Sequence, residues 1–83
     1  MGGLMFKVYI LKSDVRDRYY IGYTNNLVRR LLKHNAGSNH STRPYRPWKV
    51  VYSETLPDKR SAWLREQQIK SYKGGEAFKK LLP

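Results

Sequence analysis

Five side chains in this sequence are of the types that phosphodiester hydrolysis uses. A tyrosine or a histidine can transfer protons, a cation can neutralise the charge that develops on the phosphoryl oxygens, and a carboxylate can bind a metal ion. The candidates are Tyr9, Tyr20, Arg30, His34 and Glu66, which lie in separate segments of the chain. Their chemistry is useful only if the fold brings these segments together.

Residues 5–12 and 18–23 are predicted to form an antiparallel hairpin, because both are rich in β-branched and aromatic residues and a polar, turn-forming stretch separates them. In residues 5–12 both alternating faces are apolar, which predicts a central strand covered on both sides. Tyr9 and Tyr20 would then be neighbours across the ladder, where packing is the ordinary interpretation. Gly22 is expected to leave an open spot on the strand face of Tyr20, which a ligand can approach.

The next segment is predicted to be a helix that runs from a cap at Thr24 or Asn25 to about Ala36. At about 100° per residue its apolar side chains form one arc, which should face the core. Arg30 and His34 lie together at the edge of this arc, whereas solvated charges normally lie opposite the core. The arc consists of Leu27, Val28, Leu31 and Leu32.

A third strand is predicted over residues 48–55, followed by a helix from a cap at Asp58 to about Tyr72 and a short last helix within residues 76–82. The order β-β-α-β-α, with the short last helix, predicts an α+β fold in which helices flank a three-stranded antiparallel sheet. We expect a single domain over residues 1–83, because a chain of this length normally forms one core.

Glu66 is the carboxylate whose position in its helix is least ordinary. At 100° per residue it lies about 40° from Ala62 and about 60° from Ile69, and therefore beside the core. A carboxylate in such a place is costly unless it is paired or binds a metal. An internal ion pair with Arg30 or Arg65 is the alternative to a metal site.

The charge of the chain points to an anionic partner. Lys and Arg number 17 against 6 Asp and Glu, which gives a formal net charge of +11. No acidic residue lies between Asp17 and Glu54, and aromatic residues able to stack on bases are interleaved with the cations. A solvated basic face is the alternative, but such faces usually mix charges. We therefore expect nucleic-acid contacts from Arg29, Lys33, Arg43, Arg46 and Lys49.

Several classes of protein are disfavoured by composition. With no cysteine, the chain has no disulfide framework, thiolate nucleophile or cysteine-based zinc site. No stretch resembles a signal peptide or approaches the roughly 20 apolar residues of a membrane span. A cytoplasmic location is therefore expected.

The order of the motifs resembles the GIY-YIG endonuclease superfamily. Val8-Tyr9 is followed by Tyr20-Ile21-Gly22, then by Arg30 and His34, and later by Ala62-x-x-x-Glu66. Shorter stretches are most similar to the short standalone bacterial branch of that superfamily: Gly22-Tyr23-Thr24, Asn35-Ala36-Gly37, Thr42-Arg43, Arg46-Pro47, Val51-Tyr52-Ser53-Glu54 and Ile69-Lys70.

The resemblance implies a role for each candidate. Tyr9 would be the general base that activates water, or would position that water, and Tyr20 would help to order water around the site. Arg30 would hold and neutralise the scissile phosphate, and Glu66 would bind one divalent metal ion, Mg²⁺ or Mn²⁺. His34 falls where many members have a supporting histidine.

The chain departs from the family pattern at two places. The first motif reads Lys7-Val8-Tyr9, without its usual glycine and isoleucine, and no asparagine follows Asn39, although many members have a late polar residue near the site. Members with a defined cleavage site generally carry a separate DNA-binding domain, for which this length leaves no room. Substrate choice is therefore expected from nucleic-acid structure or from a protein partner.

Three functions are compatible with this sequence. The leading hypothesis is a metal-dependent endonuclease that acts on nucleic acid, with DNA favoured over RNA, in structure-specific nicking or repair. The alternative is a catalytically weak or inactive nucleic-acid-binding module of the same fold. A basic RNA-associated protein needs only the charge and the aromatic residues. Binding requires the cations, whereas only the nuclease requires the Glu66 carboxylate.

Overall fold

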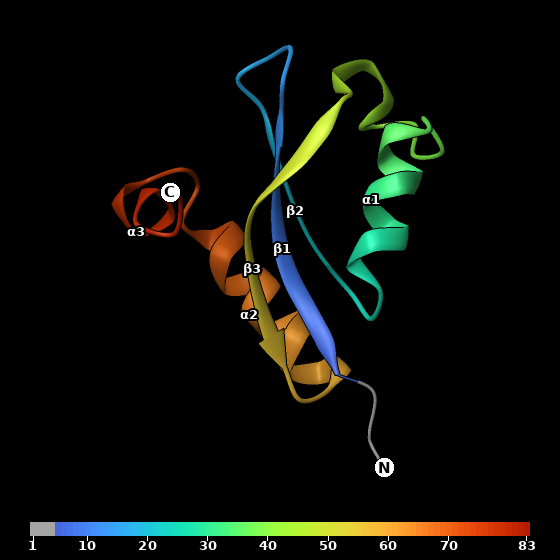
Figure 1. The fold of residues 1–83 in the computed structure, drawn as a ribbon. Coiled ribbons are helices and arrows are strands. Elements are labelled where there is room, and N and C mark those ends of the chain that lie inside the picture. Colours follow the sequence, from blue (N-terminus) through green and yellow to red (C-terminus); the bar gives the residue numbers. More distant parts are fainter. Residues whose placement is uncertain (1–4) are drawn as a thin grey trace.

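The computed structural model describes residues 5–83, so residues 1–4 of the predicted domain lie outside the described residues. Three antiparallel strands form one sheet in the order β2-β1-β3 (Figure 1). The strands are β1 (Phe6–Ser13), β2 (Tyr19–Thr24) and β3 (Trp48–Leu56). The predicted α+β class and the central position of the first strand are both confirmed.

The helices are α1 (Leu27–Asn35), α2 (Lys59–Ser71) and α3 (Glu76–Lys79). α1 lies on one side of the sheet, and α2 and α3 lie on the other (Figure 1). The last helix is shorter than the range within which it was predicted. A 3₁₀ turn, Arg43–Tyr45, interrupts the long loop between α1 and β3. None of the helices in residues 5–83 has the length and apolar character needed to cross a membrane.

Each face of β1 has its own apolar cluster. Val8 and Ile10 point to the side of α2 and α3, and Tyr9 and Leu11 point to the side of α1. All four side chains are fully buried, and a register shift of one residue would exchange the two faces, so this pattern fixes the strand in place. Their main partners are Ala62, Ile69 and Phe78 on the first side, and Trp48, Leu27 and Leu31 on the second.

The start of α1 differs from the prediction by one or two residues. Its N-cap is Asn26, whose side-chain oxygen accepts a hydrogen bond of 3.1 Å from the backbone N–H of Arg29. Thr24 instead accepts from the backbone N–H of Asn26 at 3.1 Å and so shapes the turn that enters the helix. At α2 the predicted cap is confirmed, because Asp58 accepts from the backbone N–H of Ser61.

The apolar arc predicted for α1 is only half buried. Leu27 and Leu31 pack against the sheet, but Val28 and Leu32 are 73% and 65% exposed. The two outward residues lie about 100° further around the helix than the two inward ones. A short helix that contacts the sheet along a single i, i+4 stripe buries only that stripe, and the rest of the arc faces solvent.

Candidate active site

Tyr9 and Tyr20 meet over a glycine. In the β1–β2 register Tyr9 lies opposite Gly22, and Tyr20 lies opposite Leu11. A Cβ atom at Gly22 would lie only 2.7 Å from the hydroxyl oxygen of Tyr9 and 3.0 Å from the ring of Tyr20. The space beside Gly22 that the sequence predicts is thus occupied by the phenol of Tyr9, although Gly22 also lines a hollow that a ligand can enter. The glycine lets Tyr9 lie across β2, with its ring centroid 6.2 Å from that of Tyr20.

His34 connects α1 to these tyrosines. Its side chain is almost completely buried, with 1% exposed, and its ring centroid lies 4.7 Å from that of Tyr20. Nε2 lies 3.5 Å from the hydroxyl oxygen of Tyr9, and Nδ1 lies 2.9 Å from the hydroxyl oxygen of Thr42. Thr42 was not predicted as a partner of His34, because nothing in a loop of Ser, Thr, Asn and Pro shows that the fold will bury this threonine.

Burial controls the protonation of this pair. Burial, followed by the positive charge of Arg30, holds the pKa of His34 below its usual value. Burial, followed by the neighbouring Tyr20, holds the pKa of Tyr9 well above its usual value, although Arg30 opposes that shift. At neutral pH the contact therefore joins a neutral imidazole and an un-ionised phenol.

Glu66 lies in the middle of α2 and is 8% exposed. Its carboxylate is 3.5 Å from the ammonium group of Lys70, which is itself half exposed, and accepts a hydrogen bond from Gln67. Arg65 pairs instead with Glu54 at 2.8 Å. Within residues 5–83, neither Arg30 nor Arg65 forms the ion pair with Glu66 that was the alternative to a metal site. The carboxylate is thus beside the core without an arginine to neutralise it.

One hollow of about 360 Å³ collects most of these groups. Tyr9, Tyr20, Arg30 and Glu66 line it, whereas His34 contacts Tyr9 and does not line it. Lys59 also lines the hollow and was not among the predicted site residues. Its spacing could have indicated it, because it lies seven residues before Glu66 and so on the same face of α2. The complete lining is Tyr9, Tyr20, Gly22, Tyr23, Arg30, Lys59 and Glu66.

The donor set of this hollow suits a hard cation that keeps much of its hydration. Within residues 5–83 no three His, Asp or Glu side chains come together as a metal-binding group, so Glu66 is the one acidic ligand that the hollow offers. Mg²⁺ is commonly held by one or two carboxylates together with water and substrate phosphate oxygens. A single buried carboxylate beside two cations fits an ion of this kind better than it fits Zn²⁺, which prefers four protein ligands or three with water.

The predicted nucleic-acid contacts fall into three groups. Arg29 and Lys33 lie on the exposed side of α1 and line a small hollow together with Arg30. Arg43 and Arg46 lie in the loop beyond α1 and approach Gly37. Lys49 lies apart on β3, where its ammonium group is 3.6 Å from the carboxylate of Asp14. Arg29 and Lys33 therefore share a small hollow with Arg30 but do not line the hollow of Glu66, and Lys49 lines neither of the two.

Comparison with known proteins establishes the family. Residues 5–79 match the GIY-YIG catalytic domain, so the chain belongs to the GIY-YIG family, whose catalytic domain is that of a nuclease. Among its relatives, the UPF0213 protein of Staphylococcus haemolyticus is 37% identical over 73 residues, which cover 87% of this chain and 88% of that protein. The UPF0213 protein of Clostridium perfringens is 45% identical over 64 residues, 76% of this chain and 68% of that protein. A solution NMR structure of the UPF0213 protein of Bacillus halodurans covers 88% of this chain and 89% of its own, at 30% identity and a TM-score of 0.48.

Proposed function

We propose that this protein is a metal-dependent endonuclease that hydrolyses phosphodiester bonds in nucleic acid, with DNA as the favoured substrate. The observation that carries the proposal is the shared hollow of Tyr9, Arg30 and Glu66. A group that handles a proton, a cation, and a carboxylate whose ion-pair partner is the half-exposed Lys70 surround a space large enough for a phosphodiester. The net charge of +11 supports a polyanionic substrate.

In this proposal the cations of the hollow hold the substrate. Arg30 and Lys59 line it from opposite elements, α1 and α2, so a phosphate between them would be contacted from both sides. Their positive charges are in place before the negative charge of the transition state develops, which makes stabilisation effective. A divalent ion bound at Glu66 would supply further charge stabilisation to the phosphoryl oxygens.

Tyr9 and His34 would manage the proton of the attacking water. The hydroxyl oxygen of Tyr9 accepts a proton from water while its own proton passes to Nε2 of His34, 3.5 Å away. The water oxygen bonds to phosphorus, and the bond from phosphorus to the leaving oxygen breaks with its electron pair on that oxygen. The leaving oxygen takes up a proton from solvent, and His34 afterwards releases the proton it received to solvent. The Thr42 hydroxyl donates to the backbone carbonyl of Asn39 at 3.4 Å and so can accept from Nδ1–H of His34. Neutral His34 then has its lone pair on Nε2, and a phenolate need not form.

The choice of substrate would follow from nucleic-acid structure or from a protein partner, as the sequence predicts. Flaps, junctions and nicked duplexes of the kind met in DNA repair are therefore the first substrates to compare. Within the proposal, RNA is a weaker substrate than DNA.

The decisive experiment measures cleavage by purified protein of duplex, flap, junction and single-stranded substrates, with Mg²⁺, with Mn²⁺ and with neither. We expect metal-dependent cleavage of at least one substrate. Glu66→Gln should abolish cleavage and also the rise in melting temperature that either metal causes, because it removes the charged ligand. Glu76→Gln, which makes the same change at an exposed position in α3, should change neither.

Two results would contradict the proposal. One is the absence of cleavage on every substrate with either metal, in which case the binding module of the same fold becomes the better account. The other is cleavage that survives Glu66→Gln at an undiminished rate, since a contaminating nuclease or a different site would then be responsible.

A further inference from the structure

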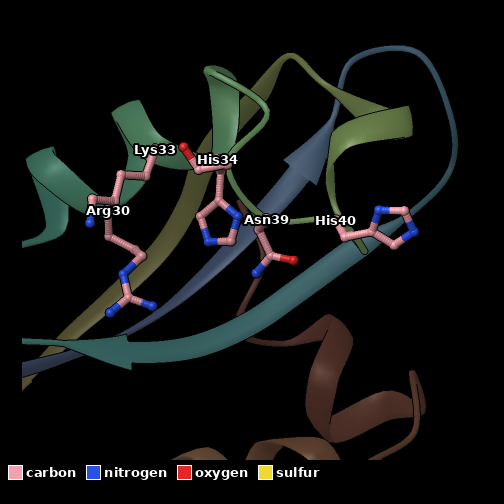
Figure 2. A pocket seen from close by; sticks show the side chains of 6 residues that line it. Arg30, Lys33, His34, Asn39 and His40 are labelled. Atoms are coloured by element: carbon pink, nitrogen blue, oxygen red, sulfur yellow. The ribbon is translucent and has the colours of Figure 1, made fainter.

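A second hollow, of about 510 Å³, adjoins the candidate active site at Arg30. Arg30 lines both hollows, and His34, which contacts Tyr9 of the first, lines the second. Figure 2 shows Arg30 and His34 extending from α1 on the same side, with Asn39 following from the loop. The complete lining is Arg30, Lys33, His34, Ser38, Asn39 and His40.

The orientation of the Asn39 amide is fixed by its neighbours. Its oxygen accepts hydrogen bonds from the backbone N–H of Ser41 at 3.0 Å and from the Ser41 hydroxyl at 2.8 Å. A backbone N–H can only donate, so the atom that receives it must be the amide oxygen. The amide nitrogen of Asn39 is then the group available to a ligand, and it carries two N–H donors.

The same reasoning fixes the tautomer of His40. Nδ1 of His40 lies 2.9 Å from a guanidinium nitrogen of Arg43. Because a guanidinium group can only donate, Nδ1 must be the acceptor and carries no proton. In the neutral ring the proton is then on Nε2, which gives His40 a free N–H donor.

The hollow therefore offers donors and positive charge in excess of acceptors. Arg30 and Lys33 add two cations that can only donate. Its lining includes no carboxylate, and the sequence has none from Arg18 to Ser53. A sugar or a peptide would present donors of its own and leave them unpaired here, whereas a phosphate presents only acceptor oxygens and negative charge.

We propose that this second hollow binds a neighbouring phosphate of the substrate strand while the scissile phosphate occupies the hollow of Tyr9 and Glu66. This inference rests on the proposed function. Arg30 lines both hollows, so a continuous strand can place one phosphate on each side of its guanidinium group. Binding at both sites would select a polynucleotide over a free phosphate and would set which bond reaches the first hollow.

The test is an NMR titration of the full chain in EDTA, where no cleavage is expected and binding is measured alone. The probes are inorganic phosphate, a thymidine dinucleotide with one phosphodiester, and a thymidine tetranucleotide with three. We expect the tetranucleotide to shift the amide signals of Ser38 and His40 and the side-chain NH₂ signals of Asn39, and to bind more tightly than the dinucleotide.

Asn39→Asp is the informative variant. An aspartate can still accept both hydrogen bonds from Ser41, but it replaces the outward NH₂ donors by a carboxylate oxygen. We expect its affinity for the tetranucleotide to fall about tenfold, the scale of one charge-assisted hydrogen bond lost. Lys33→Gln, on the exposed side of α1, should cause a similar loss without risk to the fold.

The matched control is Gln68→Glu on α2. Like Asn39→Asp, it turns an amide into a carboxylate, adds one negative charge and keeps the oxygen that already accepts a hydrogen bond, here from Arg65. It should change tetranucleotide affinity less than twofold. An equal loss in Gln68→Glu would show a general charge effect and overturn the proposal. Inorganic phosphate that shifts the same signals with equal affinity would also overturn it, as would a tetranucleotide that leaves those signals unmoved. Because no cleavage is measured, a protein without nuclease activity can still pass or fail this test.

Discussion

Tyr9 and His34 are in contact through the phenol oxygen and Nε2, and the pH dependence of cleavage should show whether a proton passes between them. With its pKa held below the usual 6.5, His34 is unprotonated and able to receive a proton throughout the neutral range. Tyr9, with its pKa raised, stays a phenol there. The proton relay therefore predicts that the cleavage rate rises with pH in the acidic range and reaches a plateau before pH 6.5.

The measurement is a single-turnover rate profile from pH 5 to 9 for the unmodified chain and for Tyr9→Phe. This variant keeps the buried ring and removes the hydroxyl, so we expect a loss of about 10²-fold in rate on the plateau. A rate that keeps rising tenfold per pH unit through pH 9 would mean that a phenolate of Tyr9 is the base and that His34 receives no proton.

Arg30 is predicted to matter more for turnover than for binding. Removing a cation that is already positioned for the transition state should cost about 10²–10³ in rate. Binding should fall far less, because the other cations of α1 and the loop still contact the strand. The measurement is the cleavage rate and the DNA affinity of Arg30→Ala, set against Arg16→Ala, an exposed arginine in the β1–β2 loop. Equal losses in the two quantities would assign Arg30 to binding alone.

At the scale of elements, the β1–β2 hairpin positions the chemistry through one missing side chain. Gly22→Ala would place a methyl group against the hydroxyl and ring of Tyr9, which is fully buried and has little room to move. We expect a loss of about 1–3 kcal/mol in the free energy of unfolding, measured by urea denaturation, together with a fall in cleavage.

A double-mutant cycle with Tyr9→Phe tests the cause of that loss. The atom nearest the new methyl group is the tyrosine hydroxyl oxygen, at 2.7 Å, and Tyr9→Phe removes it. Gly22→Ala should therefore cost less in the Tyr9→Phe background than in the unmodified chain. Additive costs would show that the backbone of β2, rather than Tyr9, resists the substitution.

The elements could be predicted from the sequence where local pattern and tertiary packing agree. β1 alternates between two apolar sets, and the fold covers both, so its central position followed directly from Val8, Tyr9, Ile10 and Leu11. α1 shows the opposite case. Its sequence pattern cannot tell which apolar stripe the sheet will cover, and the prediction included Val28 and Leu32, which face solvent.

The candidate site, like the helices and strands, could be predicted from the sequence only in part. Tyr9, Tyr20, Arg30 and Glu66 share a hollow as the motif order predicts. The Thr42 contact of His34 and the amide orientation of Asn39 could not be predicted, because both depend on how an irregular loop folds back beside α1. Hydrogen bonds across such a loop leave no periodic pattern in the sequence.

At the scale of the whole molecule, the positive charge is unevenly placed. The cations of α1 and of the following loop lie in the part of the sequence that lacks carboxylates, whereas the acidic residues Glu54 and Glu66 are each paired with a cation on α2. α1 and α3 lie on opposite sides of the sheet (Figure 1). A nucleic acid should therefore approach from the side of α1.

This arrangement predicts a strong and local salt dependence of DNA binding. The logarithm of affinity should fall linearly with the logarithm of salt concentration, with a slope of about −0.9 for each phosphate neutralised. Arg43→Ala should weaken binding about equally for different sequences and reduce the magnitude of the slope by about one, because a loop arginine without a reading helix contacts phosphate. Arg46→Ala should behave in the same way.

The control is Lys79→Ala, on α3, which removes the same charge from the other side of the sheet and should leave the slope unchanged. Fluorescence anisotropy with a labelled duplex at several salt concentrations measures all four proteins, and equal slopes for Arg43→Ala and Lys79→Ala would contradict an interface on the side of α1.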